Sequence, residues 1–255
     1  TGETRLSREV IDVALTSNFP FVELGSPFFR QALLVTLAFA ILSVIFETTI
    51  GFGQAMVLDQ EFKGRRWVRV AIILPWAIPI VIQGMLFFLL FQPTVGFGSG
   101  VMQSLGLFGD NPLASSSDSF FIVLIADVWK TSAFMALLIL AGLQSVDRSL
   151  YDVAKVSGAT PWQRFKLITL PIVMPALIVA MLFRTMDAMR VYGIIESTAG
   201  CSTVPSMTCL VIDGLFGGTR IYGTAAAVAF LTAAVIGVFI AVYLVKFRDS
   251  DGGFA

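Results

Sequence analysis

SLYDVAKVSGATPWQRFKLITLPIVMPAL, residues 149–177, separates two strongly apolar parts of the chain and differs from both in its charge. Hydrophobic residues make up 56% of the 255 residues, charged residues make up 13%, and the mean hydropathy is +0.86. Such values lie outside the range of soluble proteins and indicate a lipid solvent. We therefore interpret this stretch as a polar connection between membrane-spanning segments.

Five apolar segments are long enough to cross a bilayer, because one helical crossing needs about 20 apolar residues. They cover approximately residues 30–57, 70–92, 119–143, 167–189 and 221–245. The sequence thus predicts an all-α polytopic membrane protein whose transmembrane domain covers residues 30–246.

The placement of Lys and Arg predicts the orientation of this domain, because cytoplasmic loops of membrane proteins carry an excess of both. Basic residues gather in the connections 59–69 and 144–166, whereas the connection 93–119 has none. We expect the two basic connections and a tail over 247–255 to face the cytoplasm. The expected location is the plasma membrane of a bacterium or archaeon. Residues 1–29 are then extracytoplasmic, and because the chain starts without Met, a sixth helix is expected upstream, with a cleaved signal sequence as the alternative.

The opening stretch contains a short amphipathic helix with a defined end. The residues at helical spacing, which form an apolar or small face, are Leu150, Val153, Ala154 and Ser157. Gly158 follows where the helix would stop, since glycine takes the left-handed conformation without strain from a Cβ atom. We predict a cytoplasmic helix over about residues 147–158 that docks into a partner, and an ordinary connector on the lipid surface is the alternative.

The same stretch resembles a cytoplasmic signature of the membrane subunits of binding-protein-dependent ABC importers. That signature reads Glu-Ala-Ala, three residues, Gly, nine residues and Ile-x-Leu-Pro. The matching positions here are Asp152, Val153 and Ala154, then Gly158, and finally Ile168, Leu170 and Pro171. Asp for Glu and Val for Ala are conservative departures from it. The resemblance implies that these residues, together with Leu150, couple the chain to an ATPase.

Four further segments resemble the sugar-permease branch of this family, of the trehalose and maltose kind. They are ILPWAIPIVIQGMLFFLLF at 73–91, DVWKTSAFMALLILAGLQSV at 127–146, LFRTMDAMRVYG at 182–193 and YGTAAAVAFL at 222–231. The resemblance implies a permease subunit that forms half of a carbohydrate path. The implied partners are a second permease subunit, a dimer of ATP-binding subunits and an extracytoplasmic substrate-binding protein.

Catalysis and cofactor binding are not expected in this chain. Its sequence has no Gly-x-x-x-x-Gly-Lys-Ser/Thr loop for phosphate, so ATP and Mg²⁺ are expected in the partner subunits. A nucleic-acid partner is not expected either. An importer of another solute, such as a glycerol phosphodiester, is one alternative. A secondary transporter is a weaker one, because it would need inverted repeats or broken helices and the sequence indicates neither.

Polar side chains within the predicted spans are candidates for the solute path, because they are costly in hydrocarbon. The candidates are Gln83, Asp127, Trp129, Lys130, Arg184, Asp187 and Tyr192, whose charges would bond sugar hydroxyls and whose aromatic rings would stack on a sugar. The alternatives are structural ion pairs for the charges and a helix–helix hydrogen bond for Gln83. Glu47, a lone acid, is expected to contact the missing helix or a partner.

Cys201 and Cys209 fall in an expected extracytoplasmic connection. An oxidising compartment permits a disulfide between them, and their spacing allows it without demanding it. Two cysteines in a chain without histidine do not indicate a metal site.

Overall fold

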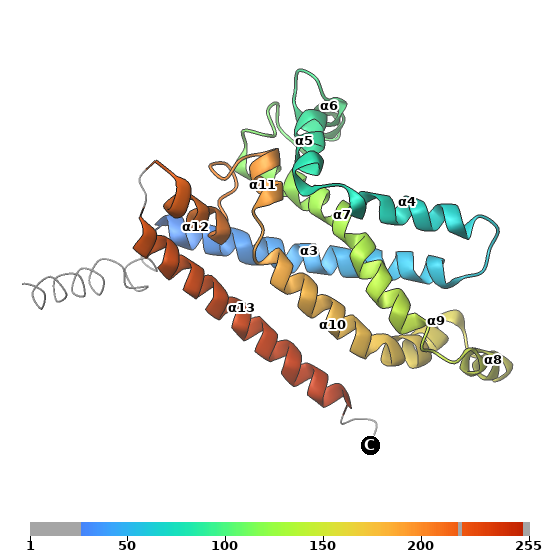
Figure 1. Ribbon diagram of the computed structural model, residues 1–255. Coiled ribbons are helices and arrows are strands. Elements are labelled where there is room, and N and C mark those ends of the chain that lie inside the picture. The colour runs from blue at the N-terminus through green and yellow to red at the C-terminus, as the bar shows by residue number, and fades with distance from the viewer. Residues whose placement is uncertain (1–26, 219–220, 252–255) are drawn as a thin grey trace, which may run out of the picture.

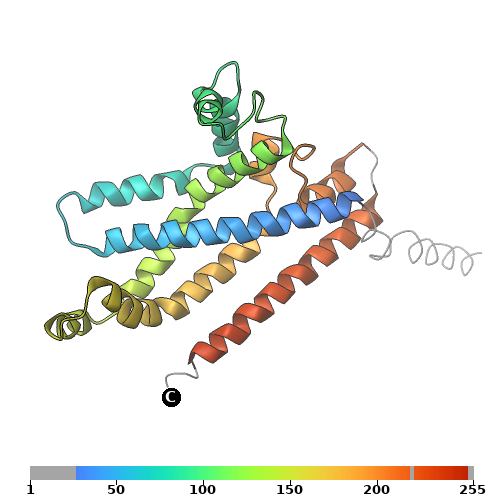
Figure 2. The same cartoon turned by 180° about the vertical axis from the view of Figure 1, so that it is seen from behind.

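The computed structural model describes residues 27–218 and 221–251, and every regular element in these ranges is a helix. The long helices are α3 (Pro27–Asp59), α7 (Ser116–Leu143), α10 (Leu170–Ala188) and α13 (Tyr222–Asp251). Figure 1 and the reverse view in Figure 2 show α4 (Arg65–Ala77) on one side of α3 and α13 on the other. Most of the expected extracytoplasmic segment 1–29 lies outside the described residues, and its last three residues begin α3.

Four helical segments are long and apolar enough to cross a membrane. They are α3, α7, the continuous stretch Pro161–Ala188 and residues Tyr222–Val245 of α13. A fifth crossing is formed if α4 and α5 (Ile80–Phe91) are counted as one bent span. These are the five predicted segments. Helix α13 continues to Asp251, so the first part of the expected tail over 247–255 is helical, and the last four residues lie outside the described residues.

The predicted span 70–92 is not one continuous helix, and the expectation that the chain has no broken helix is wrong. Helices α4 and α5 meet at an angle of 94°. The break falls at Ile78 and Pro79, where Ile78 has an extended backbone (φ −73°, ψ 130°). Proline disfavours helical geometry in the residue before it and has no N–H to donate, so Pro79 ends one helix and caps the next.

The central contact of the bundle is the crossing of α3 and α7. Gly51 lies at this crossing, and a Cβ atom built on it would be 2.7 Å from Cβ of Met135 and 3.0 Å from the backbone N of Ala136. The surrounding core includes Ala55, Leu58, Met135 and Ile139, all fully buried. Small residues permit such close helix packing in lipid, where no hydrophobic driving force pulls helices together.

The short helices gather at the two ends of the bundle (Figure 1). At one end lie α5, α6 (Phe97–Ser104), α11 (Gly193–Thr198) and α12 (Met207–Phe216). At the other lie α8 (Arg148–Val156) and α9 (Pro161–Arg164), beside the end of α3 and the start of α4. A five-residue π-helix, η1 (Phe165–Thr169), joins α9 to α10. Both basic connections identified in the sequence are thus at the same end.

Replacement of Gly51 tests the α3–α7 crossing. Gly51→Val should lower stability by about 1–3 kcal/mol, because the added atoms collide with α7 and overpack a filled core. The matched control is Gly53→Val in the same helix, where an added Cβ meets nothing within 4 Å. Thermal unfolding in detergent should show a lower midpoint for Gly51→Val alone. Equal midpoints for the two variants would contradict the close crossing.

Candidate functional site

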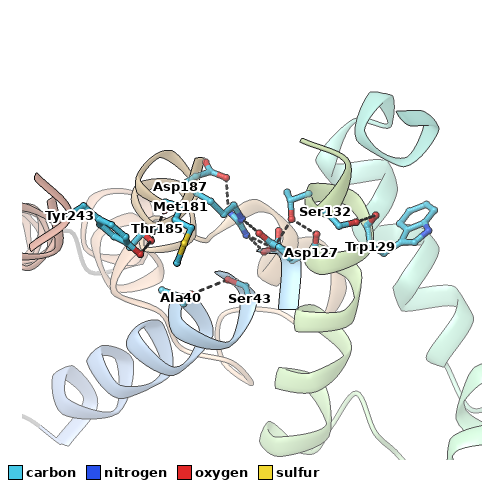
Figure 3. Close-up of polar contacts among 12 residues, drawn as sticks. Ala40, Ser43, Asp127, Trp129, Ser132, Met181, Thr185, Asp187 and Tyr243 are labelled. Atoms are coloured by element: carbon cyan, nitrogen blue, oxygen red, sulfur yellow. Dashed lines mark hydrogen bonds and ion pairs between the residues drawn. The ribbon is translucent and has the colours of Figure 1, made fainter. Parts of the chain in front are cut away.

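Arg184 on α10 is the centre of a polar cluster that joins three helices. Its guanidinium group contacts carboxylates of Glu47 on α3, Asp127 on α7 and Asp187 on its own helix. The Nε and one Nη atom of Arg184 both contact Glu47, which is a side-on fork with two parallel contacts. The dashed lines from Asp127 and Asp187 in Figure 3 follow the other two contacts.

Burial divides this cluster into two parts. Glu47 is fully buried, Arg184 is 2% exposed and Asp127 is also buried, whereas the Asp187 side chain is 70% exposed. Thr131 on α7 donates a hydrogen bond to Glu47 (Oγ1–Oε1 2.6 Å). Glu47, Asp127 and Arg184 therefore have the character of a structural ion cluster between helices, while Asp187 presents its carboxylate outward.

A small cavity of about 90 Å³ opens beside the exposed acid. Asp127, Arg184, Asp187, Arg190 and Tyr192 all line it. Arg184 donates to Asp187 (Nη1–Oδ2 2.8 Å), and this fixes one oxygen of the carboxylate. The structure thus brings together four of the predicted path residues, namely Asp127, Arg184, Asp187 and Tyr192, and it adds Arg190.

The other three predicted path residues lie elsewhere. Lys130 donates from Nζ to the carbonyl of Ile78, at the break between α4 and α5. Gln83 is fully buried and donates to the carbonyl of Ala126, which is the helix–helix contact considered as its alternative. Trp129 lines a separate, largely apolar cavity of about 620 Å³ between α3, α4 and α7.

The expected partner of Glu47 is wrong. It contacts Arg184 within this chain rather than a missing helix or a partner. The sequence did contain a signal for this contact. An acid in the middle of an apolar span is costly in hydrocarbon unless it pairs with a cation, and Arg184 is a span residue at comparable depth. Which acids contact Arg184, however, depends on how α3 and α7 cross.

The amphipathic stretch forms a helix with capped ends. Asp147 caps the start of α8 by accepting from the backbone N of Ser149 (2.9 Å), and this hydrogen bond holds the pKa of Asp147 below its usual value. At the other end the N–H groups of Gly158 and Ala159 bond back to the carbonyls of Lys155 and Ala154. Gly158 has φ +81°, so the predicted left-handed stop is present.

Most side chains of α8 are exposed. None of the nine described residues of α8 is buried, and Val153 and Val156 are 65% and 90% exposed. Leu150 and Asp152 are also exposed, and Ala154 is partly buried. Further along, Ile168 and Leu170 pack against the core of α7 and α10, and Pro171 follows in the first turn of α10. Helix α8 thus carries apolar side chains that nothing in the described part of the chain covers.

A disulfide joins Cys201 and Cys209, whose Cα atoms are 5.7 Å apart. Cys201 follows α11, and Cys209 lies in the first turn of α12. The bridge therefore ties these two short helices together at the end of the bundle opposite α8.

The chain is similar to known membrane transport proteins. Residues 47–249 match the family described as binding-protein-dependent transport system inner membrane component. The chain is 36% identical to the trehalose/maltose transport system permease protein MalF of Thermococcus litoralis, over 91% of this chain and 82% of that protein. It is 33% identical to the trehalose transport system permease protein SugA of Mycobacterium tuberculosis, over 97% of this chain and 82% of that protein.

The fold matches a solved structure as well. A bacterial ABC transporter involved in the import of the acidic polysaccharide alginate contains a chain of similar fold, with a TM-score of 0.75 and 24% sequence identity. The match covers 96% of this chain and 90% of the other.

Neutralising Glu47 tests the buried cluster. Glu47→Gln removes the forked ionic contact but leaves Arg184 with Asp127 and Asp187, so the expected loss of stability is about 1.5–3 kcal/mol, the range for a hydrogen bond to a charged group. We expect a clearly lower midpoint of thermal unfolding in detergent. Glu61→Gln, the same change at an exposed acid, should leave the midpoint unchanged. A Glu47→Gln variant as stable as Glu61→Gln would show that Glu47 does not hold Arg184.

Proposed function

We propose, since this chain belongs to the family of inner membrane components of binding-protein-dependent transport systems, that it is the permease subunit of an ATP-driven carbohydrate importer. The observation that carries the proposal is the presence of an exposed amphipathic helix, α8, at the basic end of the bundle and of a polar cavity within the bundle. The helix provides a surface for an ATPase, and the cavity provides contacts for a solute.

The basic end of the bundle faces the cytoplasm in this proposal. Lys63, Arg65, Arg66 and Arg69 precede or begin α4, and Arg148, Lys155, Arg164 and Lys166 lie in or beside α8, α9 and η1. These groups lie at one end of the structure, as the positive-inside rule requires of a cytoplasmic face. The disulfide lies at the opposite end, which fits an oxidising extracytoplasmic compartment. The C-terminal end of α13 is cytoplasmic in this orientation.

Helix α8 is the contact to the ATP-binding subunit. Its exposed Leu150, Val153 and Val156 would gain free energy by burial, about 1.5–3 kcal/mol for each side chain fully removed from water. The capped ends keep the helix formed before it binds, which lowers the entropy cost of association. ATP and Mg²⁺ are bound by that partner, and a second permease subunit supplies the other half of the path.

The solute is a neutral carbohydrate. The cavity wall combines Asp127 and Asp187 with Arg184 and Arg190, so it does not have the net positive charge that a phosphate group would require. Sugar hydroxyls both donate and accept, and the free side of Asp187 and the hydroxyl of Tyr192 can serve them. The two sugar relatives named above support trehalose or maltose as the first candidates.

The direct test is ATP hydrolysis by the complete assembly in nanodiscs with its extracytoplasmic binding protein. The panel should include trehalose, maltose, glucose, a glycerol phosphodiester and a dipeptide. Stimulation by a sugar supports the proposal and identifies the solute. Stimulation by the phosphodiester or dipeptide alone would overturn the carbohydrate assignment, and isolation of the chain without any ATPase subunit would overturn the importer assignment.

Removing the exposed acid tests the solute contact. Asp187→Ala should lower uptake into proteoliposomes by a factor of about 10–150, because a hydrogen bond to a charged group contributes roughly 1.5–3 kcal/mol. The amount of assembled complex should not change, because the side chain is exposed. Asp110→Ala, which removes an exposed acid from the loop after α6, should transport normally. Normal uptake by Asp187→Ala would remove it from the path.

A charge on the apolar side of α8 tests the ATPase contact. Val153→Asp should weaken copurification of the ATP-binding subunit at least about tenfold, since it places a carboxylate where the proposed contact would bury the methyl groups of Val153. The control is Ser149→Asp in the first turn of the same helix, where a negative charge favours the helix. Equal recovery of the ATPase subunit with both variants would argue against docking through this face.

A further inference from the structure

Helix α8 is poorly connected to the bundle that it is proposed to move. A cavity of about 490 Å³ lies between α8 and the ends of α3 and α7, with α9 and η1 on its remaining side. Its walls include Met56, Leu143, Tyr151, Arg164, Phe165 and Thr169. A movement of α8 therefore reaches the membrane helices through few side-chain contacts.

Within the described residues, two residue pairs connect α8 to other helices by polar contacts across the edge of this cavity. The first joins Arg148 to Asp59 at the end of α3, at 3.7 Å, and the Arg148 side chain is 69% exposed. Exposed ion pairs of this kind contribute little and are screened by salt. The second joins the hydroxyl of Tyr151 to Oγ1 of Thr169, at 2.8 Å, and Thr169 is buried.

Tyr151 is also the residue of α8 that packs against the core formed by α3, α7 and α10. Its ring contributes apolar contact, and its hydroxyl contributes a directional contact to one atom of η1. The two roles can be separated experimentally, because Phe keeps the ring and removes only the oxygen.

Thr169 lies at the junction between η1 and α10. It is the last residue of the π-helix η1, in which the N–H of Leu170 bonds to the carbonyl of Phe165, and it directly precedes α10. Single π-turns inside α-helices frequently occur at functional sites. Helix α10 carries Arg184 and Asp187 at its other end, so a displacement at Thr169 acts on the helix that lines the solute cavity.

We propose that Tyr151 is a positioning residue that converts movement of α8 into movement of α10 through its hydrogen bond to Thr169. This inference rests on the proposed function, because it assumes that α8 receives the movement of an ATPase. Without the hydrogen bond, the ATPase still binds α8 and hydrolyses ATP, but the bundle follows its movement incompletely.

The test measures solute transported per ATP hydrolysed. Wild type, Tyr151→Phe, Thr169→Val and the double variant are purified with their partner subunits and reconstituted in proteoliposomes with the binding protein. The probe is radiolabelled trehalose or maltose, whichever stimulates ATP hydrolysis more. Tyr151→Phe should keep ATP hydrolysis within about twofold of wild type and lower the transport ratio about three- to tenfold, a loss in the range of one directional hydrogen bond.

The double variant and a matched control make the result specific. Because both single changes remove the same contact, the double variant should be no worse than either one alone. Arg148→Gln, which breaks the exposed contact to Asp59, should keep the wild-type ratio. A purely structural role would reduce the yield or thermal stability of the complex without changing the ratio, so that outcome would overturn the proposal.

Different outcomes would overturn the role of Tyr151 and the proposed importer function. A wild-type ratio in Tyr151→Phe, with normal transport by the wild type, would overturn the role of Tyr151 and leave the importer function intact. Additive losses in the double variant would also overturn it, since they would show that the two residues act independently. A wild-type complex that moves no solute in response to ATP would overturn the proposed function and this inference together.

Discussion

The buried guanidinium group of Arg184 is the constraint on which the bundle depends. Apolar side chains give helices in lipid little preference for one neighbour or one rotation over another, because the lipid is equally apolar. A buried cation gives a strong preference, since it must keep its acidic partners within contact distance. Glu47 and Asp127 satisfy this requirement from α3 and α7. The close approach at Gly51 lies one turn along α3 from Glu47, so the same crossing serves both the packing and the ion cluster.

The buried Arg184 also holds the exposed carboxylate of Asp187, which differs from the buried carboxylates of Glu47 and Asp127. Arg184 uses its forked side for Glu47 and has another donor available for Asp187, which lies one turn further along the same helix. The exposed carboxylate is thereby oriented by a cation that is itself buried. An acid held in this way loses little conformational freedom when a ligand binds, which reduces the entropy cost of binding.

Much of this arrangement could be predicted from local sequence patterns. The five apolar segments, the helix before Gly158 and its left-handed stop follow from periodicity and from the special conformational freedom of glycine. The partners of Lys130 and Glu47 could not be predicted in this way, because they depend on which helices cross and at what depth. Lys130 lies three residues after Asp127, a spacing that suggests a pair, yet Asp127 contacts Arg184 and Lys130 turns to the carbonyl of Ile78. The break at Pro79 was marked by a proline in the middle of an apolar segment, a signal that hydropathy alone does not register.

That break has a consequence for how the chain enters the membrane. Helices α4 and α5 contain 13 and 12 residues, about 20 Å and 18 Å of helix, and neither can cross about 30 Å of hydrocarbon alone. The carbonyl of Ile78 obtains its donor from Lys130, which is synthesised some fifty residues later. Without α7 this carbonyl would lack the Lys130 donor, and an unpaired backbone group is costly in hydrocarbon. Helices α4 and α5 therefore depend on the later helix α7 for a stable place in the membrane.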